Sequence, residues 1–428
     1  MKKLVSLLLA LMMVLSLAAC GGGDTGNTGN DNPPANESKA PAASQDDVKP
    51  AQGVYDDKIV IANSAATSGP YAGIGLPYLS AIEGYLDMVN AEGGIDGRKI
   101  EFIHTDDEFD PVKGLAALEA FVEDEKVFAI VGHFGTPVVG ATLENLKDYG
   151  IPAVYFATGI GQLFADNATT NEEGYNIFPI QPLYITEGEI MVARGVGTFD
   201  ATKIGIIYTN DDAGKNMLEG AQAKCDDLGI DLVEAQVAPG SADVSAAVTS
   251  VLSEGVDFIV VGAIQATMPT IVKELAAQNN TAPAITTYVN CATPIAEQIA
   301  DSIKGKFDVY ASSWKIRDDE HAEDVAAFTK WVDPEYVNNT DGESGWVAAH
   351  VFCEGLRRLE GKTVTWEAYM EALASEPIRV PFGGTVNFQN GRRAGVESMN
   401  LSKCNMEHES GTGWELVDGF RSIEELVG

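Results

Sequence analysis

The sequence predicts an α/β protein of two lobes, each built on a mostly parallel sheet flanked by helices. Short runs rich in Val, Ile and Tyr alternate with longer stretches of helical period, which is typical of βα units that feed a parallel sheet. This alternation occurs in two successive series. Between them lies the segment Phe178–Tyr184, whose two prolines interrupt regular structure and indicate a crossing from one lobe to the other.

The chain begins with a segment that is typical of a secretion signal. Two lysines precede an apolar stretch from Leu4 to Ala19, and Cys20 follows two small residues. This segment resembles the lipobox of bacterial lipoproteins, in which the cysteine becomes the first residue and carries lipid. We therefore expect residues 1–19 to be a signal peptide and Cys20 to be lipidated. An ordinary signal peptide and a membrane anchor are the alternatives, but a span needs about 20 apolar residues.

Residues 20–54 are rich in Gly, Asn, Asp, Pro, Ser and Ala and contain almost no large apolar side chain. Such a stretch buries too little surface to offset its conformational entropy. We expect it to be a disordered tether that keeps the folded part near a membrane.

The two series that follow predict the strands and helices of the two lobes. Each apolar run is bounded by turn residues and followed by a stretch of helical period. We expect first-lobe strands at 59–63, 100–105, 128–132 and 153–157, second-lobe strands at 204–208, 232–237, 258–262 and 285–289, and second-lobe helices at 216–228, 244–254 and 270–278.

The end of the chain is less regular and predicts a return to the first lobe. A strand at 307–313 is followed by helices at 322–331, 346–359 and 366–374. A chain that builds a second lobe and then adds helices often completes the first lobe with them. We therefore expect lobe 1 to comprise residues 55–180 and 313–389, and lobe 2 to comprise residues 181–312 and 390–428.

The charge and the cysteine content of the chain argue against several classes of binding partner. The chain has 63 acidic and 28 basic residues, a net charge of −35, which argues against binding nucleic acid or anionic lipid headgroups. The four cysteines after Cys20 include no CxxC pair, so no zinc site is predicted. We favour buried or free thiols, although spacing alone leaves open a disulfide among Cys225, Cys291, Cys353 and Cys404.

The sequence shows no constellation that would perform catalysis. The five histidines have no HExxH-like spacing. The adjacent Asp106 and Asp107 face opposite sides of a predicted strand, and no EF-hand pattern surrounds Asp211 and Asp212. We therefore predict no catalytic residue, no metal and no cofactor, and expect a binding protein rather than an enzyme.

Several segments, in order along the chain, resemble the solute-binding proteins of ABC importers, specifically the branched-chain amino acid-binding group with the type I periplasmic-binding fold. The matching segments run from about residue 59 to residue 392. They include Ser68-Gly69-Pro70-Tyr71-Ala72, Ala91-Glu92-Gly93-Gly94-Ile95-Asp96-Gly97-Arg98, Ile130-Val131-Gly132-His133, Gly150-Ile151-Pro152, Gln181-Pro182-Leu183-Tyr184, Tyr208-Thr209-Asn210-Asp211-Asp212 and Gly384-Thr385-Val386-Asn387-Phe388.

The resemblance implies two lobes joined by a three-stranded hinge, with the ligand trapped between them on closure. The three crossings are expected near Pro179–Leu183, Ala311–Trp314 and Phe388–Arg392. Residues at such crossings absorb the backbone change while the lobes move as rigid bodies.

Two strand-to-helix loops of the first lobe are expected to bind the ligand. In an open parallel sheet, ligands lie beyond the carboxyl ends of strands, where helices begin with unpaired amides. The glycines of 132–137 and 157–161 permit close approach, and Thr136 and Thr158 supply hydroxyls that suit a carboxylate. The alternative is two unoccupied turns, with Thr136 acting as an N-cap. By resemblance, Thr136 matches the family's carboxylate-binding serine and Ala157–Gly159 matches the loop that contacts the amino acid.

The second lobe is expected to supply an acid for an ammonium group and aromatic side chains for an apolar tail. The sequence departs from its relatives at Ala213 and at Ala65-Ala66-Thr67, which suggests a bulkier or differently placed ligand. The full set of expected ligand contacts is Tyr71, Phe134, Gly135, Thr136, Ala157, Thr158, Gly159, Asp212, Gln265, Tyr288 and Asn290.

The predicted function is that of an extracytoplasmic, lipid-anchored, monomeric subunit that captures a small solute and delivers it to an ABC permease. An apolar or branched-chain amino acid is the expected ligand. The alternatives are another small carboxylate or amide, including an aromatic acid, and a ligand-sensing receptor domain of the same fold.

Overall fold

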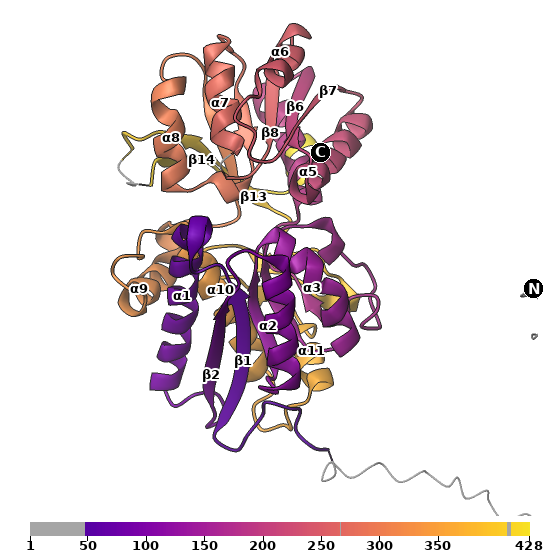
Figure 1. The fold of residues 1–428 in the computed structure, drawn as a ribbon, viewed down its shortest axis with the longest axis vertical. Coiled ribbons are helices and arrows are strands. Elements are labelled where there is room, and N and C mark those ends of the chain that lie inside the picture. The colour runs from indigo at the N-terminus through magenta and orange to yellow at the C-terminus, as the bar shows by residue number, and fades with distance from the viewer. Residues whose placement is uncertain (1–47, 266, 409–411) are drawn as a thin grey trace, which may run out of the picture. The chain divides into compact units, whose positions relative to one another are not determined.

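The computed structural model describes residues 48–265, 267–408 and 412–428. The predicted signal peptide, Cys20 and most of the expected tether lie outside the described residues. Residues 48–428 form one compact unit built on two large sheets, with a small two-stranded sheet in addition (Figure 1). Within the described residues, no helix is both long and apolar enough to cross a membrane.

The first residues of this unit are packed rather than free. The amide of Ala51 donates to the carbonyl of Val364, the Gln52 side chain donates to the carbonyl of Val127, and Val54 pairs with Ile59. The expected tether to residue 54 therefore ends too late, because these side chains and amides have partners in the first lobe.

The first lobe has a five-stranded parallel sheet in the order β2-β1-β3-β4-β5. Alternate residues of β1 enter two different cores, as the period of a strand requires. Ile59 and Ile61 pack with α1 and α10, whereas Val60 and Ala62 pack with α2 and α3. The elements are β1 (Lys58–Ala65), α1 (Ala72–Ala91), β2 (Lys99–Asp106), α2 (Pro111–Glu123), β3 (Ala129–Phe134), α3 (Thr136–Tyr149), β4 (Ala153–Ala157) and β5 (Ile177–Phe178).

The second lobe has a seven-stranded sheet in the order β14-β13-β10-β9-β8-β6-β7, in which β13 and β14 are antiparallel to their neighbours. Ile206 and Val260 pack with α4 and α5, whereas Ile207 and Val261 pack with α6, α7 and α8. The elements are α4 (Tyr184–Phe199), β6 (Lys203–Thr209), α5 (Asp212–Leu228), β7 (Asp231–Val237), α6 (Ser245–Ser253), β8 (Phe258–Gly262), α7 (Thr267–Ala277), β9 (Ala284–Thr286), α8 (Thr293–Ile303) and β10 (Val309–Ser313).

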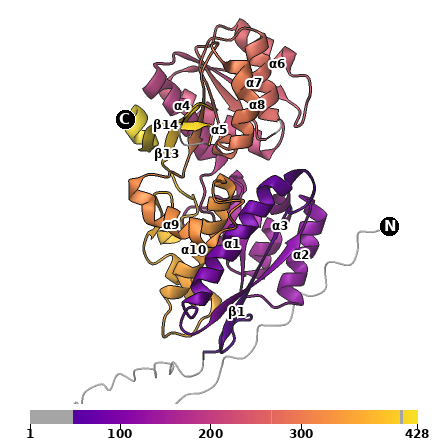
Figure 2. The same ribbon diagram turned by 90° about the vertical axis from the view of Figure 1, so that its left-hand side faces the viewer.

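After β10 the chain returns to the first lobe and then goes back to the second. Helix α10 lies beside α1 in both views (Figure 2). The returning elements are α9 (Ala322–Trp331), α10 (Thr340–Arg357), α11 (Trp366–Leu373), β11 (Ile378–Arg379) and β12 (Thr385–Val386) in the first lobe, followed by β13 (Met399–Cys404), β14 (Trp414–Arg421) and α12 (Ile423–Val427) in the second.

The three crossings are irregular segments rather than strands of a hinge sheet. Residues 179–183, 314–318 and 394–398 belong to no strand. Two prolines in the first crossing lack an amide donor, and the amide of Val396 in the third donates to the carbonyl of Ile180 in the first.

The second crossing lies later than Ala311–Trp314, because residues up to Ser313 belong to β10 of the second sheet. The third crossing lies later than Phe388–Arg392. Gln389–Gly391 forms a 3₁₀ turn on the first lobe, and Arg393 exchanges two backbone hydrogen bonds with Ala165. These contacts hold the chain on the first lobe until residue 393.

The strand expected at residues 285–289 is shorter than predicted. Strand β9 ends at Thr286, and Tyr288–Asn290 forms a 3₁₀ turn. The hydroxyl of Thr287 accepts from the amide of Val289 and so stabilises this turn.

Candidate functional site

A cavity of about 80 Å³ lies where the carboxyl ends of strands from both sheets meet the crossings. Strands β3 and β4 end at it in the first lobe, and β8, β9 and β10 lead to it in the second. This is where an open parallel sheet binds ligands. Its lining residues comprise an apolar group (Ile74, Tyr78, Phe109, Phe134, Ala157, Ile264, Val289, Cys291 and Trp314) and a polar group (Gly135, Thr136, Gln181, Tyr184, Gln265, Tyr288, Ser313, Lys315, Thr340, Asp341 and Ser344).

The start of α3 presents hydrogen-bond donors to the cavity. Gly135 is the N-cap with φ of 92°, and a Cβ at this position would lie 2.6 Å from the Phe109 ring, so the position requires glycine. No side chain caps this helix. Among the described residues, the amides of Thr136 and Val138 have no hydrogen-bond acceptor. The Thr136 and Thr158 hydroxyls lie 2.8 Å apart beside these amides, an arrangement that suits a carboxylate.

A network of polar and aromatic side chains connects the first crossing to the second lobe. Gln181 accepts from the Tyr155 hydroxyl at 2.8 Å and donates to the Tyr288 hydroxyl at 2.7 Å. The Tyr288 hydroxyl donates to the carbonyl of Pro182 at 3.2 Å. The rings of Tyr184 and Tyr288 are stacked, with centroids 6.1 Å apart. The network fixes two aromatic faces against the cavity.

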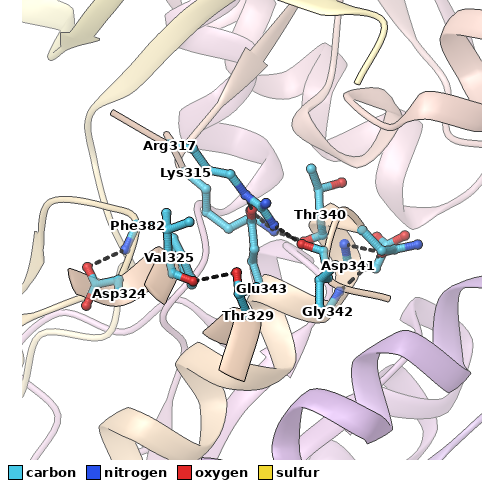
Figure 3. A network of polar contacts seen from close by, with 12 residues as sticks. Lys315, Arg317, Asp324, Val325, Thr329, Thr340, Asp341, Gly342, Glu343 and Phe382 are labelled. Atoms are coloured by element: carbon cyan, nitrogen blue, oxygen red, sulfur yellow. Dashed lines mark hydrogen bonds and ion pairs between the residues drawn. The ribbon is translucent and has the colours of Figure 1, made fainter. Parts of the chain in front are cut away.

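The second crossing and the start of α10 bring four charged side chains together (Figure 3), and two of them, Lys315 and Asp341, line the cavity. Arg317 donates to Glu343, and Lys315 lies 3.8 Å from the other oxygen of the same carboxylate. Lys315 also donates to the carbonyl of Thr340 and to the Ser344 hydroxyl. Burial lowers the pKa of Lys315, while Glu343 and Asp341 oppose this shift.

Asp341 belongs to the same group of charged side chains, but unlike Glu343 it lines the cavity. Its amide is capped by the Asn339 side chain at 2.7 Å. Burial raises the pKa of Asp341 to about 6, and the charge of Lys315 opposes this rise. The carboxylate is therefore ionised at neutral pH.

Six of the residues predicted from the sequence line the cavity: Phe134, Gly135, Thr136, Ala157, Gln265 and Tyr288. Thr158 and Asn290 do not line it but lie directly behind it. Thr158 bonds to Thr136, and Asn290 accepts from the amide of Gln265 at 2.8 Å and donates to the Ala263 carbonyl at 2.8 Å. These two residues position residues that line the cavity.

Tyr71, Gly159 and Asp212 also lie outside the cavity lining. The Tyr71 ring stacks on Phe109 with centroids 3.9 Å apart, so Tyr71 supports a lining residue. Gly159 accepts from the amide of Tyr184, and a Cβ there would lie 2.9 Å from the Tyr288 hydroxyl. Asp212 is exposed at the start of α5, so it is wrongly placed to be the acid that accepts an ammonium group in this cavity.

The described cysteines are free thiols, of which Cys225, Cys353 and Cys404 are buried and Cys291 is half-buried. Burial raises the pKa of Cys291 beside the cavity to about 12. The described residues contain no group of three or more His, Cys, Asp or Glu side chains placed to hold a metal ion.

A family model described as periplasmic binding protein matches residues 58–411, most of the chain and both lobes. The chain belongs to the periplasmic binding protein family. This is a family of substrate-binding proteins that work outside the cytoplasm. The predicted family and the predicted function class, a solute-binding protein, are therefore confirmed.

Related sequences agree with this membership. An amino acid binding protein of Pseudomonas aeruginosa is 24% identical over 226 residues, which cover 52% of this chain and 59% of the relative. A Leu/Ile/Val-binding protein homolog of Brucella abortus is 25% identical over 285 residues, which cover 65% of this chain and 73% of the relative. The match to the Pseudomonas protein thus spans less than two thirds of that protein's length.

Solved structures confirm the type I fold of this periplasmic binding protein. A fatty acid ABC transporter substrate-binding protein from Thermomonospora curvata superimposes with a TM-score of 0.74 at 20% identity, covering 89% of this chain and 96% of that one. A branched chain amino acid ABC transporter protein from Thermus thermophilus with bound valine gives 0.71 at 17% identity, covering 86% and 97%. At these identities the likeness establishes the fold alone.

Sequence reasoning missed the charged side of the cavity in this periplasmic binding protein. Lys315 directly follows the crossing that was expected to end at Trp314. A lysine next to a tryptophan at an expected hinge could have been predicted to be a cavity residue. Asp341 could not be predicted in the same way. The helix was expected to begin at Trp346, so residues 340–345, which include Asp341, were not assigned to it. Gln181 was recognised as part of a family motif but not as a cavity residue, whereas Tyr184 was considered as an aromatic residue that could face the cleft.

Proposed function

We propose that this protein captures a small amino-acid-like solute between its lobes and delivers it to the membrane permease of an ABC importer, without making or breaking a bond. The observation that supports this is the cavity itself. It lies between the lobes and combines unpaired amides and hydroxyls at the start of α3 with aromatic walls and opposite charges. A zwitterion with an apolar side chain matches all three features.

The size of the cavity favours a small solute. About 80 Å³ corresponds to a few water molecules, since one water occupies roughly 10–15 Å³ on this measure. A fatty acid, the ligand class named for one structural neighbour, has a long chain and no cationic group. The relatives named for amino acids or for Leu, Ile and Val support the smaller ligand.

We propose further that the two lobes have the predicted boundaries with three changes: the first lobe begins by residue 51, and the second and third crossings lie at residues 314–318 and 394–398. We also propose that the protein acts as a monomer. Cys20 would carry lipid and hold the protein at the outer face of a membrane, close to the permease. Several acyl chains anchor firmly, whereas one binds only marginally. The mass of the N-terminal peptide from membrane-extracted protein tests this: an unmodified Cys20, or an intact signal segment, would contradict it.

The ligand assignment is tested by thermal denaturation of the purified protein with leucine, isoleucine, valine or phenylalanine. Ligand that binds only the folded state raises the midpoint by mass action. We expect at least one of these amino acids to raise it. If none does, while another small carboxylate or amide does, the amino acid assignment fails and the solute-binding role stands.

Substitution of Thr136 tests the site within the same experiment. Thr136→Ala removes a hydroxyl beside the α3 amides and should weaken binding roughly tenfold, the size of one hydrogen bond to a charged group. Thr136→Ser keeps the hydroxyl and serves as the control. Equal affinity of both variants would remove Thr136 from the site.

A further inference from the structure

The first turn of α10 carries two acidic side chains, of which Glu343 has cationic partners within 4 Å. Glu343 is 2% exposed and is matched by Arg317 and Lys315, so its charge is already balanced. Asp341 lies two residues earlier and lines the cavity. In the described part of the chain, its carboxylate has neither a hydrogen bond nor a cationic group within 4 Å. Asp341 is therefore a charged acceptor without a partner.

The helix does not use the Asp341 side chain for its own stability. Asn339 is the N-cap, and its side chain accepts from the amides of Asp341 at 2.7 Å and Gly342 at 3.2 Å. An acid in the first turn does interact favourably with the helix dipole, by up to about 2 kcal/mol at a half-buried position such as this one, but this interaction occupies neither carboxylate oxygen with a hydrogen bond. Capping therefore leaves the carboxylate of Asp341 available.

Lys315 cannot neutralise Asp341 through direct contact. Its ammonium group donates to the Thr340 carbonyl and the Ser344 hydroxyl, and it lies over the ring of Trp314 at 5.1 Å. These contacts hold the crossing against α10 (Figure 3). The positive charge of Lys315 favours the ionised form of Asp341 without direct contact. The carboxylate still needs a hydrogen-bond donor, and a group bound in the cavity can supply one.

The second lobe contributes no acid to the described lining of the cavity. Its lining residues are Tyr184, Ile264, Gln265, Tyr288, Val289, Cys291 and Ser313, none of which carries a negative charge at neutral pH. Glu187 on α4 accepts from the amide of Tyr288 but does not line the cavity, and burial raises its pKa to about 8. The first lobe lines the cavity with one acid, Asp341.

We infer that Asp341 binds the cationic amino group of the solute. This inference rests on the proposed function, and it assigns the ammonium group to the first lobe, on the helix that returns after the second crossing, rather than to the second lobe. It predicts that the protein selects amino acids over the same carboxylic acids without the amino group. The carboxylate of the solute then lies at the start of α3 and its apolar side chain lies against the aromatic walls.

The test compares two ligands and three proteins. The ligands are the amino acid that stabilises the wild-type protein most and its counterpart without the amino group, for example leucine and 4-methylpentanoate. The proteins are the wild type, Asp341→Asn, and Asp212→Asn as a matched control, since Asp212 begins a helix at its own N-terminal turn but lies outside the cavity lining. Calorimetric titration gives each dissociation constant.

We expect Asp341→Asn to weaken amino acid binding roughly 10- to 100-fold, the size of a charge-assisted hydrogen bond, and to change binding of the desamino acid less than threefold. Asp212→Asn should bind both ligands as the wild type does. Retained binding of the desamino acid also shows that the Asp341 variant is folded.

Three outcomes would overturn the inference: Asp341→Asn binds the amino acid as tightly as the wild type, it loses both ligands equally, or the wild type does not prefer the amino acid. A wild-type protein that binds none of the amino acids overturns the proposed ligand class itself. The wild-type titration therefore distinguishes failure of the proposed function from failure of the assignment to Asp341.

Discussion

Glu187 on α4 is a buried acid next to the cavity. One of its carboxylate oxygens accepts from the amide of Tyr288 at 2.7 Å, and the other has no hydrogen-bond partner among the described residues. Burial raises the pKa of Glu187 from its ordinary value of 4.5 to about 8. The folded protein therefore holds a proton on Glu187 at neutral pH, whereas the unfolded chain releases it.

The sign of the resulting pH effect follows from proton binding. Below pH 4.5 both states are protonated, so Glu187 costs nothing. Between pH 4.5 and about 8 the folded state binds more protons than the unfolded state, so the free energy of unfolding falls as the pH rises. Above about pH 8 the full cost is present.

Glu187→Gln removes this titration. We expect the variant to gain stability relative to the wild type by a few kcal/mol between pH 5 and pH 8, measured by urea denaturation at each pH. Other groups titrate in both proteins and cancel in the difference. A difference that stays constant across this range would show that Glu187 is ionised in the folded state.

At the residue scale, the sequence predicted the loops of the cavity better than the role of each side chain. Thr136 and Tyr288, which were both among the expected contacts, line the cavity. They could be chosen from the sequence because one follows a glycine-rich strand end and the other is an aromatic residue after a strand. Thr158 and Asn290 lie behind it, because the direction of a side chain at a loop depends on tertiary hydrogen bonds such as that from Gln265 to Asn290. Spacing along the chain carries no record of those bonds.

At the element scale, strands and helices were predicted where an apolar period exists, and helix starts were placed late where the first turn is polar. Helix α5 begins at Asp212 rather than residue 216, and α10 at Thr340 rather than residue 346. In each case a cap, Asp211 or Asn339, bonds the first amides and starts the helix ahead of its apolar face. The unpredicted first turn of α10 is the one that carries Asp341.

The packing of α4 against α5 depends on glycine. A Cβ on Gly220 of α5 would lie 1.9 Å from the carbonyl oxygen of Ile185 on α4, and a Cβ on Gly188 would lie 2.3 Å from that of Met217. The two backbones therefore approach more closely than any side chain permits, which holds the first crossing against the second lobe.

Gly220→Ala should lower the free energy of unfolding by about 1–3 kcal/mol, the usual cost of overpacking, because rigid backbone must move. Gly140→Ala is the control, since Gly140 lies inside helix α3 with the nearest atom at 4.0 Å, and alanine there should stabilise by about 0.5–1 kcal/mol. Urea denaturation measures both. Equal stability of the two variants would contradict the close contact.

At the scale of the whole molecule, the two lobes are in direct contact across the cavity. The amide of Gly161 in the first lobe donates to the side chain of Asn216 on α5 at 2.8 Å, and the Thr340 hydroxyl lies 3.5 Å from the carbonyl of Cys291. Contacts of this kind form only when the lobes are together, so they stabilise the closed state relative to an open one.

Asn216→Ala should weaken ligand binding roughly three- to tenfold although Asn216 does not line the cavity, because apparent affinity falls with the fraction of closed protein. Titration calorimetry gives the affinity, and the radius of gyration in solution should fall on ligand addition more in the variant than in the wild type. Gln222→Ala, on the exposed part of the same helix, is the control. Wild-type affinity in the Asn216 variant would show that this contact does not stabilise closure.

The three passages of the backbone between the lobes have a consequence for anyone who cuts or rearranges the gene. Neither half is a continuous stretch of polypeptide, since the first contains α9, α10 and α11 from late in the chain and the second contains β13, β14 and α12. A deletion from the C-terminal end that passes residue 394 removes pieces of both halves, since β13 and β14 are followed by first-lobe elements in that direction. A protease nick in any one passage leaves the halves tied by the other two, so such a nicked molecule would stay assembled on a sizing column and separate only in denaturant.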